Sequence, residues 1–401
     1  MGPDGDLRFT AGAPAVAYDS HARRYLVVWA GRDGSGDREI WGRLVSARGR
    51  PLGSQFRISD MGGPGERRQQ AASPAVAYNP IAGEYLVVWS GDGKTRGDYE
   101  IFAQRLDALG REIGDDDFRI SRMGADRDTR FGAFVPDVAF NPRRNEYLVV
   151  WRGDDGSGSL VDGEWEIFAQ RLSADGSPIA ANGERISDAG PDGDTRFGAG
   201  FPSVAYNATD DEYLVVWAAD DTGVDNEFEI FGQRLDGAGR EVGENDFRVS
   251  DVGPAGDPRF GARTPRVAYG SSRNEYLVVW WGDDAADGLV EGEFEVFGQR
   301  LSAGGRKVGT EGFRISRMGA EGEPGFAALV PSLAYGLAGR EFVVAWYGDT
   351  GEPPLEDNEL EIYVASVPEG GAAPSEAIRV SYMGRDGKYL FAAVDPAVAY
   401  N

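Results

Sequence analysis

The chain of 401 residues contains no cysteine and a single histidine. Without cysteine, the protein has no disulfide, no thiolate metal site and no cysteine nucleophile. The histidine, His21, lies in the polar stretch DSHARR. It has no second histidine with which to share a metal ion, and we expect it to be a solvated turn residue. Chemistry based on thiolates or on paired imidazoles is therefore excluded.

Long apolar segments are also missing. The longest are YLVVW runs, far shorter than the roughly 20 residues that cross a bilayer as a helix. No segment shows a sustained helical period of apolar residues, and a charged-then-apolar leader is absent from the start of the chain. Sialidase-type SxDxGxTW boxes, GxSxG and phosphate-binding loops are absent as well. We therefore expect neither membrane insertion nor a helical fold.

Positive charge is scarce relative to negative charge. The chain has 41 Lys and Arg against 66 Asp and Glu, which gives a formal net charge of −25. Such a surface repels nucleic acid backbones and anionic lipids, so both are poor candidates as partners. Cations, and neutral or cationic ligands, remain open.

What the chain does have is a repeat, in which a Pro-led VAY segment, YLVVW, an acidic loop, EIFGQRL and FRIS follow one another. A repeat of this regularity predicts one array rather than several separate domains. We therefore treat residues 1–401 as a single domain. Its repeats span residues 14–73, 74–135, 136–201, 202–264, 265–330 and 331–395, and a partial seventh copy begins at 396–401.

Each repeat contains four short segments of strand character. In the second repeat these are residues 75–78, 85–89, 100–106 and 118–121, which are rich in β-branched and aromatic residues. Their short connections predict an antiparallel meander. YLVVW is apolar on both faces of a strand, so neighbouring sheets must cover both. The predicted fold class is an all-β, six-bladed β-propeller of four-stranded antiparallel blades with one surplus terminal strand.

The order P-x-VAY-N, YLVVW, EIFGQRL and a glycine turn resembles NHL-type and related bacterial propeller repeats. The resemblance covers essentially the whole chain but rests on apolar spacing and turns, and the units here are longer, with an extended acidic loop. It implies a scaffold fold with a Pro-led innermost strand. It leaves function open, because propellers support many unrelated activities.

The two ends of the chain fall within repeats. The opening GPDGDLRFTAGAP matches residues 190–202 almost letter for letter, and the VAY segment occurs a seventh time near the C-terminus. These features lead us to expect a piece of a longer, secreted polypeptide, located extracellularly or at the cell surface. They also predict possible self-association through the terminal strands.

Acidic residues recur at both ends of the long loop that follows YLVVW. Three or four carboxylate oxygens converging there suit Ca²⁺, which takes six to eight oxygen ligands, although no EF-hand string is present. The alternative is that these acids are solvated or pair with the Arg residues of FRIS and GQRL. The metal candidates are Asp154, Asp155, Glu164, Glu166, Asp220, Asp221, Glu227, Glu229, Asp283, Asp284, Glu293 and Glu295.

Aromatic residues occupy the same loop ends. Tyr99, Trp165, Phe228 and Phe294 each stand between the two acids at the loop end, and Trp281 opens the fifth loop. We predict that these five residues pack between blades or form stacking platforms for sugars, since aromatic faces beside polar groups suit carbohydrate.

Paired carboxylates also suggest glycoside hydrolysis, which needs one acid and one base or nucleophile. Here the pairs recur in every repeat, whereas catalysis requires one asymmetric pair with separated pKa values. We therefore expect a non-catalytic binding or scaffold propeller with a glycan or protein ligand and no catalytic residues. The alternatives are a structural repeat unit of a large surface protein or assembly, and a glycan-active propeller enzyme.

Overall fold

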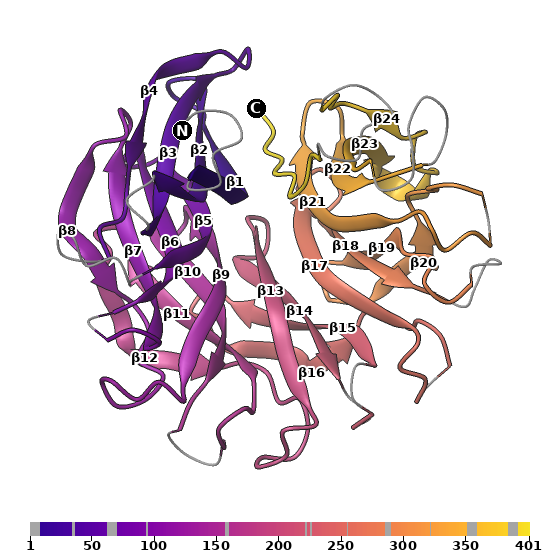
Figure 1. Cartoon of the computed structure of the whole chain (residues 1–401), viewed down its shortest axis with the longest axis horizontal. Coiled ribbons are helices and arrows are strands. Elements are labelled where there is room, and N and C mark those ends of the chain that lie inside the picture. Colours follow the sequence, from indigo (N-terminus) through magenta and orange to yellow (C-terminus); the bar gives the residue numbers. More distant parts are fainter. Residues whose placement is uncertain are drawn as a thin grey trace. The chain divides into compact units, whose positions relative to one another are not determined.

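The structure is a computed structural model composed almost entirely of β-strands (Figure 1). It describes residues 9–33, 37–61, 70–93, 95–156, 160–220, 223–224, 227–254, 256–284, 290–320, 322–350, 359–383 and 392–401. The helical element in this part of the chain is one short 3-10 turn, η1 (Glu369–Gly371). No helix among these residues is long and apolar enough to span a membrane.

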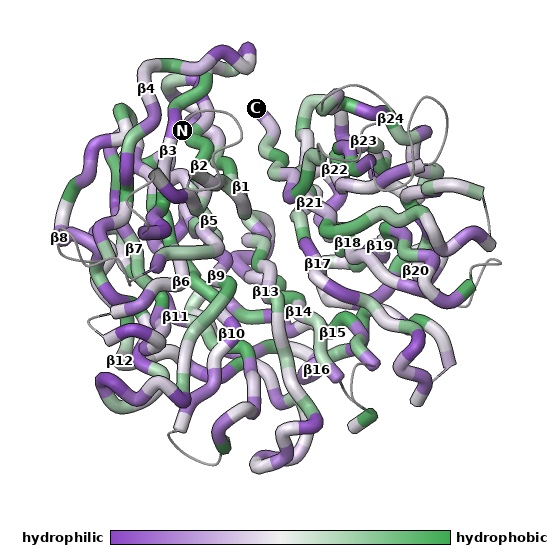
Figure 2. The backbone as a smooth tube through the Cα atoms, in the orientation of Figure 1, coloured by the Kyte–Doolittle hydropathy of each residue, from purple (hydrophilic) through white to green (hydrophobic). Residues whose placement is uncertain are grey.

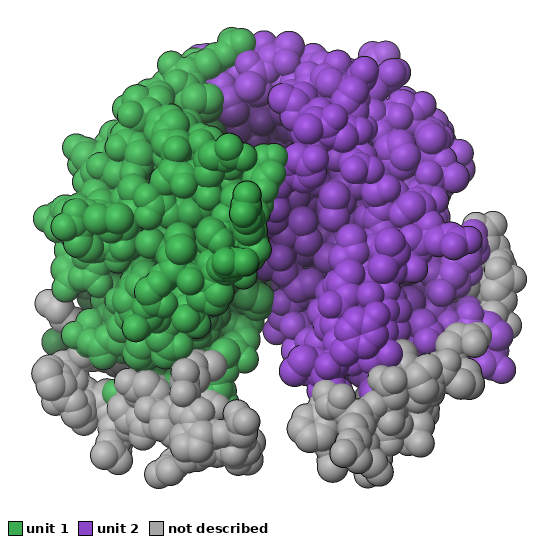
Figure 3. Space-filling view, turned by 90° about the horizontal axis from the view of Figure 1, so that it is seen from above, with its two compact units in different colours: residues 1–195, 401 green, residues 196–400 purple. Residues whose placement is uncertain are grey.

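The chain divides into two compact units, residues 1–195 with 401, and residues 196–400 (Figure 3). The first unit contains three four-stranded antiparallel sheets, in which each strand pairs with the next along the chain. Blade 1 is β1 (Phe9–Asp19), β2 (Arg24–Asp33), β3 (Arg38–Ser46) and β4 (Pro51–Arg57). Blade 2 is β5 (Ala71–Asn79), β6 (Glu84–Asp92), β7 (Tyr99–Asp107) and β8 (Glu112–Arg119). Blade 3 is β9 (Gly132–Asn141), β10 (Glu146–Asp154), β11 (Glu166–Ser173) and β12 (Pro178–Arg185).

The second unit contains three sheets with the same connectivity. Blade 4 is β13 (Gly198–Asn207), β14 (Glu212–Asp220), β15 (Phe228–Asp236) and β16 (Glu241–Arg248). Blade 5 is β17 (Gly261–Gly270), β18 (Glu275–Asp283), β19 (Glu295–Ser302) and β20 (Lys307–Arg314). Blade 6 is β21 (Ala328–Gly336), β22 (Glu341–Gly348), β23 (Glu361–Pro368) and β24 (Ile378–Arg379). The prediction of an all-β propeller with six four-stranded antiparallel blades is confirmed.

The strands are longer than their apolar segments predict. In blade 2 the first strand begins at Ala71 rather than Ala75, and the second continues past Trp89 to Asp92. The fourth strand begins at Glu112 and ends at Arg119, so Ser121 lies outside it. Polar residues extend the strands because ladder hydrogen bonds depend on the backbone and not on the side chain. Figure 2 shows the apolar stretches running along the strands of both units.

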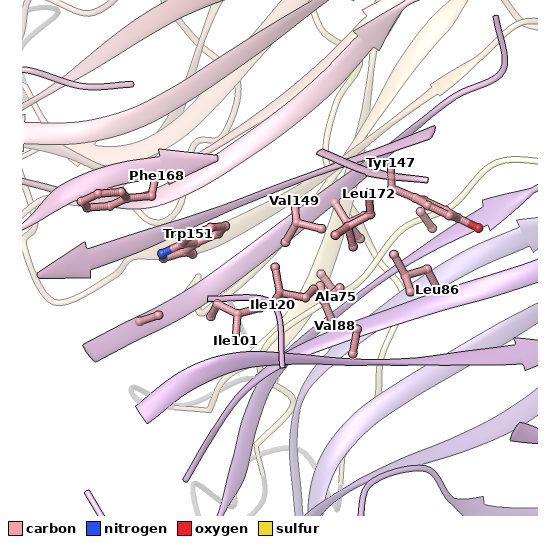
Figure 4. Packing of buried hydrophobic residues seen from close by; sticks show 14 of the residues in the cluster. Ala75, Leu86, Val88, Ile101, Ile120, Tyr147, Val149, Trp151, Phe168 and Leu172 are labelled. Atoms are coloured by element: carbon pink, nitrogen blue, oxygen red, sulfur yellow. The ribbon is translucent and has the colours of Figure 1, made fainter. Parts of the chain in front are cut away.

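Packing between neighbouring blades explains the two apolar faces of YLVVW. Within the first unit β1 lies beside β5 and β5 beside β9, and within the second β13 lies beside β17 and β17 beside β21. Between blades 2 and 3, Leu86 and Val88 of one sheet share a cluster with Val149 and Trp151 of the next (Figure 4). Both faces of the second strand are therefore covered by sheets, as predicted.

The residue before each repeat proline has a positive φ. Val135 has φ 52°, Thr264 49° and Val330 46°, although β-branched residues avoid this region. The strand pairing shifts its register at the same place, between Arg263 and Arg266 in blade 5, for example. A bulge of this kind re-aims side chains on the innermost strand, and such strain costs about 1–3 kcal/mol.

The seventh copy repeats this local conformation. Asp395 has φ 53°, and the Val398 amide donates to Ser332 Oγ at 3.0 Å. The equivalent Val267 amide donates to Ser203 Oγ at 3.3 Å between blades 4 and 5. The extra terminal strand therefore packs on blade 6 as the first strand of a blade does. Self-association through this strand stays a prediction.

Candidate functional site

The second acid of each loop-end pair is buried in a polar cluster within its own blade. In blade 5, Glu295 is fully buried and accepts hydrogen bonds from the Arg314 guanidinium and the Ser316 hydroxyl. The Met318 amide also donates to Glu295, at 2.8 Å. Glu295 thus anchors the segment after FRIS to the third strand.

This cluster recurs with small variations. Arg248 donates to Glu229 at 2.6 Å and Arg379 to Glu361 at 2.8 Å, whereas Arg185 stands 4.0 Å from Glu166. The prediction that the acids pair with the Arg of FRIS is confirmed for these clusters. The alternative that they are solvated is wrong for Glu166, Glu229 and Glu295, because all three are buried.

The pKa of these carboxyls differs between blades. Burial raises the pKa of Glu166 to about 7 despite the hydrogen bonds from Ser187 and the Ala189 amide. At Glu361 burial also acts to raise the pKa, but hydrogen bonds from Ser381, Met383 and Arg379 outweigh it and lower the pKa below its usual value. One repeated position therefore holds carboxyls of opposite behaviour.

We expect Glu166→Gln to weaken the pH dependence of stability. Because the folded pKa of Glu166 is raised, the folded state binds its proton more tightly than the unfolded state, and stability is lost as pH rises from about 4.5 to about 7. Between about pH 5 and about pH 8, the free energy of unfolding of the variant should rise by at least about 1 kcal/mol relative to that of the parent protein. Urea unfolding across this range measures the change.

Glu361→Gln is the matched control for that measurement. The lowered pKa of Glu361 contributes stability that is lost only as pH falls below its ordinary range. The loss of unfolding free energy caused by this substitution should stay constant between about pH 5 and about pH 8. An identical pH profile for both variants would contradict the assignment.

The first acid of each pair binds backbone amides of the segment that follows FRIS. Glu164 accepts from the Gly193 amide at 3.0 Å, Glu227 from Gly256 at 2.5 Å and Glu293 from Gly322 at 3.0 Å. These contacts bring the long acidic loop and the segment after FRIS together at one end of blades 3, 4 and 5. All three carboxylates are buried, so they hold the two segments together.

The Asp at the end of the second strand closes the same loop. Asp154 accepts from the Gly163 amide at 2.6 Å, and burial raises its pKa to about 6. Asp283 behaves alike, with a pKa raised by burial to about 6, and Asp220 is also buried. Asp155 and Asp284 are partly buried beside them, and Asp221 lies outside the described residues.

Metal binding by these acids is not established by their contacts. Within the described ranges, no group of three or more His, Cys, Asp or Glu side chains is arranged to hold a metal ion. The loop acids bind amide and guanidinium groups of the protein instead. Calcium binding at these loops stays a prediction.

The aromatic candidates lie where the blades differ from one another. One pair of facing residues on the first and second strands is small in three blades, namely Gly12 with Ala30, Ala72 with Ser90 and Gly200 with Ala218. In blade 3 the same pair is Phe134 with Arg152, in blade 5 it is Arg263 with Trp281, and in blade 6 it is Leu329 with Tyr347. Blades 3 and 5 therefore carry an arginine and an aromatic ring at one position, in opposite order.

The blade-3 cluster consists of Tyr99, Phe134, Arg152 and Trp165. The ring centroids of Tyr99 and Phe134 are 5.0 Å apart, and those of Phe134 and Trp165 are 5.6 Å apart in an edge-on arrangement. Arg152 Cζ lies 4.1 Å from the Trp165 ring centroid. All four side chains are partly buried, which leaves each of them in contact with both protein and solvent.

The blade-5 cluster, which consists of Phe228, Arg263, Trp281 and Phe294, has the same plan. Arg263 Cζ lies 5.0 Å from the Phe228 ring centroid, and the rings of Trp281 and Phe294 are edge-on at 5.2 Å. In both clusters the preceding blade supplies the first ring and the blade itself supplies the other three side chains. The five aromatic candidates predicted from the sequence thus fall into two clusters, one within each unit.

Phe134, Arg152 and Arg263 complete these clusters but are missed by reasoning from the recurring residues. The signal in the sequence is a position that does not repeat: it is small in three blades, Leu329 with Tyr347 in blade 6, and an arginine with an aromatic residue in blades 3 and 5. The Trp residues at the end of the YLVVW runs are buried core in blades 2 to 6, whereas Trp29 of blade 1 is partly exposed. His21 is exposed in its turn, also as predicted.

The sequence matches no family model, and no curated protein matches it. Among solved structures, the chain is similar to a polysaccharide lyase of the PL25 family, an ulvan lyase bound to a GlcA–Rha3S oligosaccharide. That similarity has a TM-score of 0.55 and 10% identity, over 94% of this chain and 86% of that one. The chain is also similar to an α-L-arabinanase of Penicillium chrysogenum, with a TM-score of 0.52 and 13% identity, over 88% and 92% of the two chains.

A third similar structure is a puromycin hydrolase, with a TM-score of 0.50 and 15% identity over 94% of this chain and 48% of that one. At these identities the likeness supports the propeller fold, and specific NHL-type repeats are not shown. The expectation of a non-catalytic protein is corrected by these neighbours, which are enzymes and include a lyase and an arabinanase that act on glycans. The glycan-active alternative fits them better than a binding or scaffold role.

Proposed function

We propose that this protein is a carbohydrate-active β-propeller with two glycan-binding clusters, one in blade 3 and one in blade 5, each of which binds sugar by itself. The observation that carries the proposal is the pairing of an arginine with an aromatic residue in these two blades, at a position that holds small residues in blades 1, 2 and 4 and Leu329 with Tyr347 in blade 6. Residues that serve the fold recur in every blade. A substrate is asymmetric, so the residues that bind it are expected where the repeat breaks.

The chemistry of the clusters supports a sugar ligand. Partly buried aromatic rings offer apolar faces to the C–H groups of a sugar, and nearby polar groups bind its hydroxyls. The Trp281 indole Nε1 is buried and has no hydrogen-bond partner among the described residues. An N–H group of this kind is costly to bury unless a ligand or water accepts its hydrogen bond.

The similar lyase and arabinanase structures add support from outside the chain, since both have propeller folds of comparable length and act on polysaccharides. The repeated carboxylates are not suited to catalysis because they bind backbone amides and arginines inside each blade. An extracellular or cell-surface location follows from a polymeric substrate.

The test is an activity screen on a panel of plant and algal polysaccharides. Hydrolysis releases new reducing ends, and elimination releases reducing ends together with an unsaturated sugar that absorbs ultraviolet light. We expect product from at least one polymer, and about a tenfold or greater loss with Trp165→Ala or Trp281→Ala, since base- or sugar-stacking rings contribute on the order of 1–3 kcal/mol.

Trp41→Ala provides the control, because Trp41 is a partly buried tryptophan of blade 1 outside both clusters. It should retain the activity of the parent protein. The proposed function would be contradicted if the protein neither bound nor degraded any polymer, or if all three variants lost activity equally.

A further inference from the structure

We propose that the glycan is acidic and that Arg152 and Arg263 bind the carboxylates of its uronic acid residues. This inference rests on the proposed function and adds the class of substrate to it. It starts from the polar contacts of the arginines that stack on aromatic rings.

Seven arginines of the described residues stack on an aromatic ring, and five of them also have a polar partner. Arg130 binds Asp128, Arg259 binds Asp257, and Arg379 binds Glu361. Arg300 donates to the Pro368 carbonyl, and Arg196 has a further contact of its own. Arg152 and Arg263 make no hydrogen bond and no ion pair with the described residues, and each guanidinium lies over an aromatic ring.

This lack of a partner is unusual in so acidic a chain. The protein has 66 Asp and Glu for 41 Lys and Arg, so carboxylates are in excess. The carboxylate nearest in sequence to Arg152 is Asp154, which accepts from the Gly163 amide instead. Arg152 interacts electrostatically with Asp154 but forms no ion pair with it, and burial alone accounts for the lowered pKa of Arg263. Both guanidinium groups lie next to aromatic rings.

Both guanidinium groups are also partly removed from water. Burial lowers the pKa of each arginine from its ordinary value, and the Arg152 Nε is buried without a hydrogen-bond partner. A charge removed from water without a partner is destabilising, and the contact with a ring offsets only part of this cost. An anionic ligand would supply the missing acceptor.

A uronic acid combines the two features that each cluster offers to bind. Its carboxylate matches the planar, bidentate fork of a guanidinium, and its sugar ring matches the neighbouring aromatic faces. The net charge of −25 does not prevent this, because distant surface charges are screened beyond about 8 Å at physiological ionic strength. Close arginines determine the local potential.

The experiment is calorimetric titration with an oligogalacturonate and with the same oligosaccharide after reduction of its carboxyl groups to alcohols. We expect the acidic form to bind at least about tenfold more tightly, since hydrogen bonds to charged groups contribute about 1.5–3 kcal/mol. Arg152→Gln and Arg263→Gln should each weaken the acidic form by about tenfold and leave the reduced form nearly unchanged.

Arg259→Gln is the matched control, because Arg259 also stacks on a ring, Phe260, but is paired with Asp257 at the surface. It should bind both sugars like the parent protein. Arg152→Lys and Arg263→Lys keep the charge without the bidentate fork, so they separate the effect of the charge from that of the bidentate geometry. An unchanged melting temperature of each variant confirms that it is folded.

Equal affinity for the acidic and reduced sugars, with no effect of the Arg substitutions, would overturn the inference and leave the proposed function standing. Tighter binding of a sulfated neutral oligosaccharide than of the oligogalacturonate would reject the carboxylate as the bound group. Failure of every sugar to bind, together with inactivity on all polymers, would instead refute the proposed function.

Discussion

Replacing Glu295 with alanine is expected to lower the free energy of unfolding by about 3–5 kcal/mol. Glu295 and Arg314 are both buried, with side-chain exposures of 0% and 2%. Removal of the carboxylate leaves the Arg314 guanidinium charged inside the blade, and the Met318 amide loses its acceptor. The midpoint of urea unfolding measures the loss.

Two further variants test whether the unpaired buried charge causes this loss of stability. Asp257→Ala breaks the exposed pair of Arg259 and Asp257 and should change the midpoint little, since surface ion pairs contribute little to stability. The double variant Glu295→Leu with Arg314→Met removes both charges together and should recover much of the loss. A double variant as unstable as Glu295→Ala would contradict the explanation.

Replacing Trp151 with alanine is expected to cost about 3–5 kcal/mol of unfolding free energy through the cavity that it leaves. Trp151 is fully buried between blades 2 and 3, stacked on Phe168 with 6.2 Å between ring centroids. Its indole Nε1 donates to Met123 Sδ at 3.3 Å. Neighbouring sheets are too tightly packed to fill so large a space, so the loss should appear fully in urea unfolding.

Trp165→Ala is the comparison within the same blade. Trp165 is only partly buried, so its replacement should cost clearly less stability than that of Trp151. The same substitution should remove the proposed sugar contact, whereas Trp151→Ala should alter sugar binding only through misfolding. Equal stability losses for the two variants would show that Trp165 is a core residue and not part of a binding surface.

The fold is readable from the chain because each repeat carries its own strand pattern. The alternation of Tyr85, Val87 and Trp89 with Leu86 and Val88 requires a sheet on each side of the strand. Strand ends are less predictable. Polar residues such as Glu84 and Asp92 join the ladder because the backbone forms the hydrogen bonds.

The sequence predicted only some of the residues of the candidate site. Residues that recur in every repeat are the easiest candidates to identify, and the repeated acids are the clearest of these in the loops. The structure places them inside the blades, where Glu166 and Glu295 bind serine and arginine side chains and backbone amides. They hold the loop ends in place, and so the residues that vary between blades become the better candidates for binding.

The sequence by itself determined the architecture, since a strand that is apolar on both faces and recurs six times can be buried only by stacking sheets. It also determined that the five aromatic candidates lie at the loop ends. Only the tertiary structure decided which other side chains surround these candidates. Phe134 and Arg152, for example, are 18 residues apart in the chain and are brought together by strand pairing. The structure also decided that Arg152 and Arg263 lie against aromatic rings, since a side chain's partners depend on strand register and on the neighbouring blade.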